Sequence, residues 1–214
     1  MSERRSIKET VIDKLTPDII DEMKTIHFIS DLHFGHNKII EICGRPTTIE
    51  NHNKWLIEEV WNKYIGKKDT VYILGDLSFE NKEKSDKILD KLHGKKKFMI
   101  LGNHDKSVET STRFTQITQI KDFNFSLKDF NIHVNLCHYP ILEWNRQFHG
   151  SWHLYGHSHC RPLNYLNELA FDVSIDRKNW WRPYNLYQIC YVMHYIELGK
   201  PDDEIIEELL KMEI

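Results

Sequence analysis

The sequence of 214 residues predicts a mixed α/β sandwich, with one half wound as βαβ units and the other richer in hairpins. Short apolar, β-branched runs recur, and five of them end abruptly in a polar motif. The first three runs are separated by segments with helical spacing of apolar residues, which favours parallel strands with right-handed crossovers. Later in the chain, two strand-like runs flank the short turn 128–129, as in a hairpin.

These observations place most elements. Strands are expected directly before the five polar motifs, at residues 25–30, 70–74, 97–101, 132–137 and 152–155. Helices are expected at 50–64 and 82–92, where apolar side chains recur at helical spacing, and at the acidic-capped segment 202–212. Residues 123–127 are expected to pair with 132–137, and further strands are expected at 170–175 and 187–195.

The domain organisation follows from length and composition. Residues 1–24 are polar, with a short amphipathic helix expected at 7–15 before Pro17, and are interpreted as an N-terminal extension outside the main core. Residues 25–214 are long enough for a single domain with its own core.

Composition restricts the environment and the partners. We expect neither a membrane span nor a secretory leader, because no apolar run approaches about 20 residues and the N-terminus lacks an apolar segment. The four cysteines form no CxxC pair, which predicts free thiols in the cytoplasm. A net charge of −3 argues against a broad basic footprint for long nucleic acid. The 13 histidines, many beside apolar runs, suggest a metal site.

Candidate ligands follow the five strands. The motifs are Asp31-Leu-His33, Gly75-Asp76, Gly102-Asn103-His104-Asp105, His138, and Gly156-His157-Ser158-His159. Each motif alone is weak, since turns and caps use the same residue types. Sites in open α/β sheets gather at the carboxyl ends of strands, so five such ends together indicate one shared site. Imidazole, carboxylate and amide ligands without thiolate favour Mn, Fe or Zn over a structural zinc, and a bridging carboxylate favours two ions.

The combined motifs, from about residue 25 to 195, resemble the calcineurin-like metallophosphoesterase superfamily. The DLHFGHNKII opening, the Arg45-Pro46 step and the stretch HYPILEW…HGSWHLYGHSH look like its small, uncapped bacterial and phage phosphoesterases. The resemblance implies a four-layer α/β/β/α sandwich with a dinuclear centre. It assigns one metal to Asp31, His33, Asp76 and His159, and the other to Asp76, Asn103, His138 and His157, with Asp76 as the bridge. The expected cofactors are two divalent ions, manganese first, with iron, zinc or nickel as alternatives.

The expected chemistry is attack by a metal-bridging hydroxide on phosphorus, in line with the leaving oxygen. By resemblance, His104 stabilises charge on the phosphoryl oxygens and protonates the leaving alkoxide. Asp105 either orients His104 or caps the segment that follows it.

Substrate contacts are expected from two residues. His36 and Arg45 are the first candidates to bind phosphate. The alternative for each is a surface salt bridge or a role in supporting the metal ligands. Weaker candidates for substrate contacts are Arg146, His149 and Arg182. Five aromatic residues could either stack on a nucleobase or belong to the core, and the core is expected for most of them: Trp144, Trp152, Trp180, Trp181 and Tyr184. Structural roles are expected for His27, His93 and His133.

The leading functional hypothesis is a phosphodiesterase that hydrolyses a small nucleotide or a nucleic-acid end, with a phosphomonoesterase as the alternative. The segment GDLSFEN lacks the acidic partner of the phosphoprotein phosphatase branch, and the chain has no room for the capping domain of the exonuclease branch. A non-catalytic protein-binding scaffold requires lost ligands, whereas all seven ligand positions and His104 are present. A structural-zinc protein is the remaining alternative.

Overall fold

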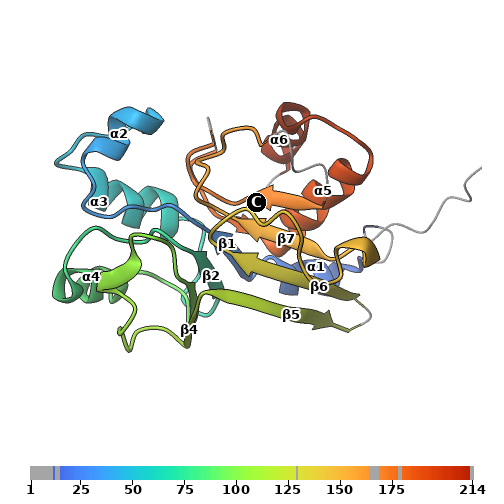
Figure 1. The fold of residues 1–214 in the computed structure, drawn as a ribbon, viewed down its shortest axis with the longest axis horizontal. Coiled ribbons are helices and arrows are strands. Elements are labelled where there is room, and N and C mark those ends of the chain that lie inside the picture. The colour runs from blue at the N-terminus through green and yellow to red at the C-terminus, as the bar shows by residue number, and fades with distance from the viewer. Residues whose placement is uncertain (1–11, 13–14, 129, 164–168, 178–179, 213–214) are drawn as a thin grey trace, which may run out of the picture.

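Two stacked sheets and their flanking helices form the molecule (Figure 1). The computed structural model describes residues 12, 15–128, 130–163, 169–177 and 180–212. The architecture confirms the predicted α/β sandwich of mixed sheets. None of the helices in these ranges is long and apolar enough to cross a membrane.

The first sheet has the strand order β4-β3-β2-β1-β9. Its strands are β1 Ile26–Ile29, β2 Thr70–Leu74, β3 Lys96–Ile100, β4 Gln116–Thr118 and β9 Tyr184–Asn185. Strands β1 to β4 pair in parallel, whereas β9 runs antiparallel to β1. The helices expected at 50–64 and 82–92 are present as α3 His52–Trp55 with the π-helical turn Leu56–Trp61, and as α4 Lys82–Leu89. Helix α2, Lys38–Cys43, precedes them and was not predicted.

Alternation along β2 explains how this sheet is covered on both faces. Val71 and Ile73 point to one face and pack with Trp61 and the other buried residues of the crossover helices. Tyr72 and Leu74 point to the opposite face and pack in the larger core, which the second sheet shares. Because side chains alternate along a strand, a continuous apolar run fits a strand that is buried on both faces.

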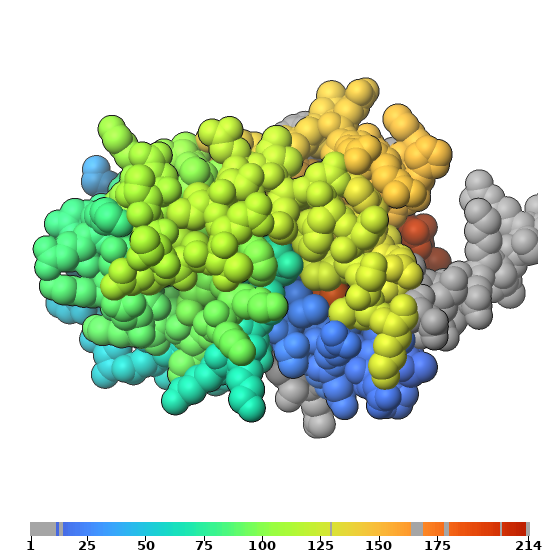
Figure 2. All heavy atoms as spheres, turned by 90° about the horizontal axis from the view of Figure 1, so that it is seen from below, coloured from blue at the N-terminus to red at the C-terminus, as the bar shows by residue number. Residues whose placement is uncertain are grey.

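The second sheet has the order β5-β6-β7-β8, with β5 Ile120–Leu127, β6 Phe130–Cys137, β7 Trp152–Tyr155 and β8 Ala170–Asp172. The predicted hairpin is confirmed, since β5 and β6 pair antiparallel with Leu127 opposite Phe130. Strands β6, β7 and β8 pair in parallel. In Figure 2, β5 (yellow-green) lies across the lower face beside α1 (blue), where Lys128 and Asp18 form an ion pair.

The predicted strand at 187–195 is wrong, because this segment lies within helix α5, Leu186–Glu197. Asn185 and Gln188 form a reciprocal capping box that starts the helix. Leu186, Ile189 and Met193 then fall on one helical face, which is buried in the larger core that both sheets share. Periodicity alone does not separate a short buried strand from a buried helix. The predicted C-terminal helix is confirmed as α6, Asp202–Lys211.

The core includes residues that precede residue 25, where the sequence predicts that the domain begins. The interpretation of residues 1–24 as an extension outside the core fails for helix α1, Pro17–Met23, because Ile19 and Met23 are fully buried in that core. The helix expected at 7–15 falls almost entirely outside the described residues.

Candidate metal centre

Residues at the ends of β1, β2, β3, β6 and β7 meet at one edge of the two sheets. Asp31, Asp76 and His138 are fully or almost fully buried there, and His33 is 3 % exposed. Two groups of candidate ligands form here, and within each group the ligand atoms lie within 4.8 Å of one another. The first group is Asp31, His33 and His159, and the second is Asp31, Asp76 and His138. The structure therefore brings residues that are more than a hundred positions apart in sequence into contact.

The backbone at this edge is strained. Five of the seven predicted ligands have a positive φ, namely Asp31, His33, Asp76, His157 and His159. Such conformations are uncommon for residues other than glycine and persist only where the surroundings enforce them. Here the amide of Asp31 donates to Gly75 O over 3.0 Å and that of His33 to Asp76 O over 2.9 Å. The loops after β1 and β2 thus hold each other in the conformation that points the ligands inward.

Asp76 lies between the two groups of ligands. Its Oδ2 is 3.6 Å from His33 Nε2, and its Oδ1 is 3.5 Å from His138 Nε2. Each carboxylate oxygen therefore faces a different imidazole, which is the arrangement that a bridging ligand needs. Asp31 Oδ1 completes the first side, at 3.8 Å from His33 Nε2 and 3.7 Å from His159 Nε2.

Asn103, His138 and His157 form the other side. The Oδ1 of Asn103 lies 3.2 Å from His138 Nε2, and the rings of His138 and His157 are 5.1 Å apart. His138 Nδ1 donates to the carbonyl of Leu74 over 2.8 Å, which fixes the tautomer with a lone pair on Nε2. Nearby, buried His153 accepts from the amide of Ile141 over 3.0 Å and so secures the loop that follows His138.

The chemistry of these donors fits divalent cations. Both ring nitrogens of His33 are buried and have no hydrogen-bond partner among the described residues, and burial lowers the pKa of this ring to about 2, so that it is neutral. Burial also raises the pKa of Asp31 to about 7. A buried imidazole without hydrogen-bond partners and a buried carboxylate are both costly, and a bound cation would offset the cost of each. Neutral imidazoles, carboxylates and an amide oxygen are suitable donors for manganese, iron or zinc.

Three glycines make room for the ligands. A Cβ on Gly102 would lie 2.4 Å from Asp76 Oδ1, and one on Gly75 would lie 2.3 Å from His138 Nδ1. A Cβ on Gly156 would lie 2.6 Å from Asp31 Oδ2. The glycine of each motif is therefore explained by the close approach of the backbone to a ligand side chain.

Arg45 is not a substrate contact, and this prediction is wrong. Arg45 is 4 % exposed, and its guanidinium pairs with both oxygens of Asp176, over 2.7 and 2.8 Å. Its other donors contact the carbonyls of Asp31 and Leu32 and the ring of His52. Because every guanidinium hydrogen has a protein partner, none is free for a phosphate.

Asp176 and Cys43 were missed from the sequence. Asp176 Oδ2 accepts from His159 Nδ1 over 2.6 Å, so Arg45 and Asp176 together orient His159 toward Asp31. Burial alone would raise the pKa of Asp176, but the hydrogen bonds from His159 and Arg45 hold it at about 2. The thiol of Cys43 lies 3.6 Å from the same nitrogen of His159. Asp176 follows the strand expected at 170–175, and this position was the available signal.

Asp105 supports the backbone of the site. Its Oδ2 accepts from the amides of Asp76 and Gly102, over 2.8 and 2.7 Å, and its Oδ1 accepts from the amide of Leu77 over 2.8 Å. These bonds join the loops after β2 and β3. The sequence left open whether Asp105 orients His104 or caps the segment that follows it. These contacts agree with a capping role, but the capped amides belong to Asp76, Leu77 and Gly102 and not to the segment after Asp105.

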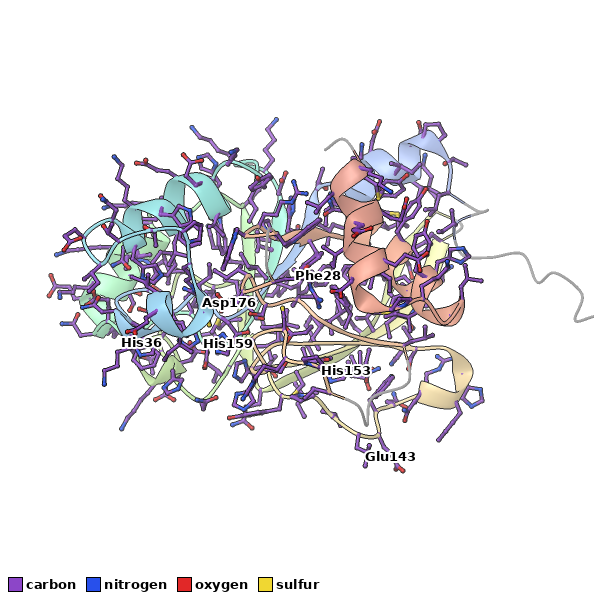
Figure 3. All side chains as sticks on the ribbon, turned by 90° about the horizontal axis from the view of Figure 1, so that it is seen from above. Phe28, His36, Glu143, His153, His159 and Asp176 are labelled. Carbon is purple, nitrogen blue, oxygen red and sulfur yellow. The ribbon has the colours of Figure 1, made fainter. Side chains whose placement is uncertain are left out.

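His104 and His36 lie at the open rim. The side chain of His104 is 43 % exposed, its backbone amide donates to Asp76 Oδ1 over 3.0 Å, and its ring packs 4.3 Å from that of Phe79. His36 stacks on Phe79 at 4.1 Å and lies 5.5 Å from His33. Figure 3 shows His36 on the same side of the molecule as His159 and Asp176.

The weaker substrate candidates line a separate hollow, pack against other side chains or are buried. Arg146 and His149 line a separate hollow of about 340 Å³ with His133, on the polar face of the β5–β6 hairpin. Arg182 stacks over Trp180 at 4.0 Å. The aromatics Trp144, Trp152, Trp180 and Tyr184 are buried, and Trp181 packs edge-on against Trp55. The core interpretation is therefore correct for most of these rings. His27 pairs with Asp69, and His93 bonds to the carbonyl of Ile65, which agrees with structural roles for both.

Comparison with known proteins agrees with this site. The chain belongs to the calcineurin-like phosphoesterase family, whose sequence profile matches residues 24–211. An uncharacterized protein of Methanocaldococcus jannaschii is 34 % identical over 189 residues, covering 83 % of this chain and 94 % of its own length. The gene 66 protein of Mycobacterium phage D29 is 29 % identical over 201 residues, covering 83 % of this chain and 100 % of its own length.

A solved structure supports the fold. The crystal structure of a protein of unknown function from Aquifex aeolicus matches with a TM-score of 0.56 and 22 % identity, over 77 % of this chain and 96 % of that chain. Family membership and the clusters of ligands together indicate metal-dependent hydrolysis of phosphate esters.

Proposed function

We propose that this protein is a dinuclear metal-dependent phosphodiesterase that acts on a small nucleotide diester or a nucleic-acid end. The observation that carries the proposal is the position of Asp76, whose two oxygens face His33 and His138 on opposite sides. We assign one ion to Asp31, His33, Asp76 and His159, and the other to Asp76, Asn103, His138 and His157. Two bound ions would supply charge for the phosphoryl oxygens and a water that deprotonates near neutral pH, for which manganese is our first choice.

The residues around the ions have separate tasks. Leu74 and Asp176 fix the tautomers of His138 and His159, so that Nε2 of each ring faces the carboxylates. His104 is held beside Asp76 through its own backbone amide and keeps an exposed ring, which suits a proton donor to the leaving oxygen. His36 packs on the same Phe79 ring as His104 and is proposed to contact the substrate.

An open rim supports a diester rather than a monoester as the substrate. Phe79 and Tyr139, on different sides of the ligands, are 41 % and 43 % exposed. A diester carries a second organic group on phosphorus, and this rim leaves space for it. A monoester needs no such space.

The first experiment measures hydrolysis of p-nitrophenyl phosphate and bis(p-nitrophenyl) phosphate with Mn²⁺, together with bound metal by elemental analysis. We expect two ions per chain and faster cleavage of the diester. Strong monoester cleavage without diester cleavage would refute the diester assignment. For Asp76→Asn we expect lost metal and a fall in turnover of more than about 100-fold, because even partners outside the ligand shell cost about 10–100-fold.

A second experiment separates proton donation from metal binding. His104→Ala should keep both ions and lose about 10²–10⁴-fold in turnover, with the largest loss for poor leaving groups. His149→Ala is the matched control, since His149 lines the separate hollow on the hairpin. Loss of metal from His104→Ala would show that its role is ligation instead.

A further inference from the structure

A pocket of about 480 Å³ adjoins the centre on the side of Asn103 and Tyr139. Both residues line this Tyr139 pocket and also border the ligands. The Tyr139 hydroxyl donates to Asn103 Oδ1 over 3.4 Å, and its ring lies 4.8 Å from that of His157. The volume falls within the usual range for small-molecule sites, so a group attached to a phosphate at the centre has a place to bind.

The lining suits a nucleoside. Leu101, Ile120 and Cys137 supply apolar surface, and Tyr139 supplies a partly exposed aromatic ring. Lys106, Glu109 and Gln119 add a cation, an acceptor and an amide, and the side chains of these three have no hydrogen bond or ion pair with any described residue. A base needs a ring to stack on and edge partners, and the sugar needs polar contacts, all of which this lining offers.

A second hollow at the centre is less suitable. It has about 470 Å³, and its charged lining consists of Asp176, Asp203 and Glu207 with one cation, Arg177. The Tyr139 pocket has two carboxylates, Asp105 and Glu109, beside Lys106, and it also offers a tyrosine ring, which the second hollow lacks among its lining residues. The second hollow is therefore the more acidic of the two and repels the anionic backbone of a nucleotide more strongly.

The position of His104 decides which end of the substrate enters the pocket. The His104 ring packs against Phe79, and neither residue lines the Tyr139 pocket. The leaving oxygen must lie near the proton donor, so it lies on the Phe79 side. We infer that the Tyr139 pocket binds the nucleoside that stays attached to phosphorus, which makes the product a nucleoside monophosphate. This inference rests on the proposed function.

The reaction is then a simple hydrolysis. A water releases one proton to solvent and its oxygen forms a bond to phosphorus, while the bond from phosphorus to the leaving oxygen breaks. His104 supplies the proton that the leaving group takes and regains one from solvent. The nucleoside stays in the Tyr139 pocket as its monophosphate. No oxidant or further reactant is needed.

The test compares two chromogenic diesters with Mn²⁺, the p-nitrophenyl ester of thymidine 5′-phosphate and methyl p-nitrophenyl phosphate. Wild type should prefer the thymidine ester in kcat/KM by about 10-fold or more, as expected for one stacked base. Ile120→Trp fills the pocket and should lower kcat/KM for the thymidine ester about 10-fold more than for the methyl ester. Ile42→Trp, at an exposed position on α2, is the matched control and should leave the preference unchanged.

A binding measurement does not depend on hydrolysis. In ¹³C-methyl NMR, thymidine 5′-monophosphate should shift the Ile120 signal saturably and leave Ile42 and Ile49 in place, whereas inorganic phosphate should shift none of them. An unmoved Ile120 signal, equal losses for both esters in Ile120→Trp, or release of free thymidine would each overturn the inference. Wild type that cleaves neither ester would instead refute the proposed function.

Discussion

Replacing Arg45 by methionine tests whether this residue is a buried clamp. Methionine keeps an unbranched, shorter apolar stem and loses the guanidinium, so the Asp176 carboxylate is left buried without the Arg45 cation. Breaking one side of a buried ion pair costs about 3–5 kcal/mol. For a chain of this size, about 1 kcal/mol corresponds to roughly 2–4 °C in Tm. We therefore expect the Tm to fall by roughly 6–20 °C.

The assay is thermal unfolding followed by circular dichroism, on metal-free protein so that metal affinity does not contribute. The matched control is Arg113→Met, because Arg113 also pairs with an aspartate, Asp90, at 3.0 Å, but is 40 % exposed. Exposed pairs contribute about 0–1 kcal/mol, so the control should melt within about 4 °C of wild type. Should Arg45→Met not fold, Arg45→Lys keeps the charge without the two-pronged contact and should show a smaller loss. An Arg45→Met protein that melts like the control but has a raised KM would refute the clamp and restore a substrate contact.

Three further predictions follow from the packing and protonation of the site. Gly102→Ala should lose metal and activity, because its Cβ would lie 2.4 Å from Asp76 Oδ1. Gly66→Ala should retain both, because its nearest contacts would be with the Asp69 carboxylate, at 3.0 Å or more. Elemental analysis measures the bound metal, and a fully metallated Gly102→Ala would contradict the packing argument. Burial lowers the pKa of His153 from 6.5 to about 4, so the unfolded chain binds more protons below pH 6.5 and the free energy of unfolding falls as the pH falls. Urea titrations at pH 7.5 and 5 should therefore show a loss about 2 kcal/mol smaller in His153→Gln than in wild type, and equal losses would exclude His153 as a source. Removing the metal with a chelator should lower the Tm, because an ion whose free concentration is 100–1,000 times its Kd stabilises the folded protein by about 2.7–4.1 kcal/mol. In Asp76→Asn the chelator should have little effect on the Tm. An unchanged wild-type Tm would argue against bound ions.

Local patterns predicted the parts of this protein that depend on local chemistry. The predictions of the strand 70–74 and of the hairpin were correct because a short apolar, β-branched run and a pair of turn residues act over a few positions. The candidate ligands could be named because each follows such a strand, and the ends of parallel strands meet at one edge. The prediction for residues 187–195 is wrong because an apolar run does not distinguish a buried helix from a buried strand, whereas the capping box at Asn185 marks the start of a helix.

Partners that are distant in sequence were decided only by the tertiary structure. Arg45 and Asp176 are separated by 131 positions, and no local pattern predicts that the guanidinium of Arg45 pairs with a carboxylate inside the protein. The same holds for Asp105, whose carboxylate holds the amides of Asp76 and Leu77 from another loop. A sequence specifies which groups a chain carries, whereas burial and hydrogen-bond partners depend on how remote segments pack, and these determine whether a charged residue binds a ligand or supports one.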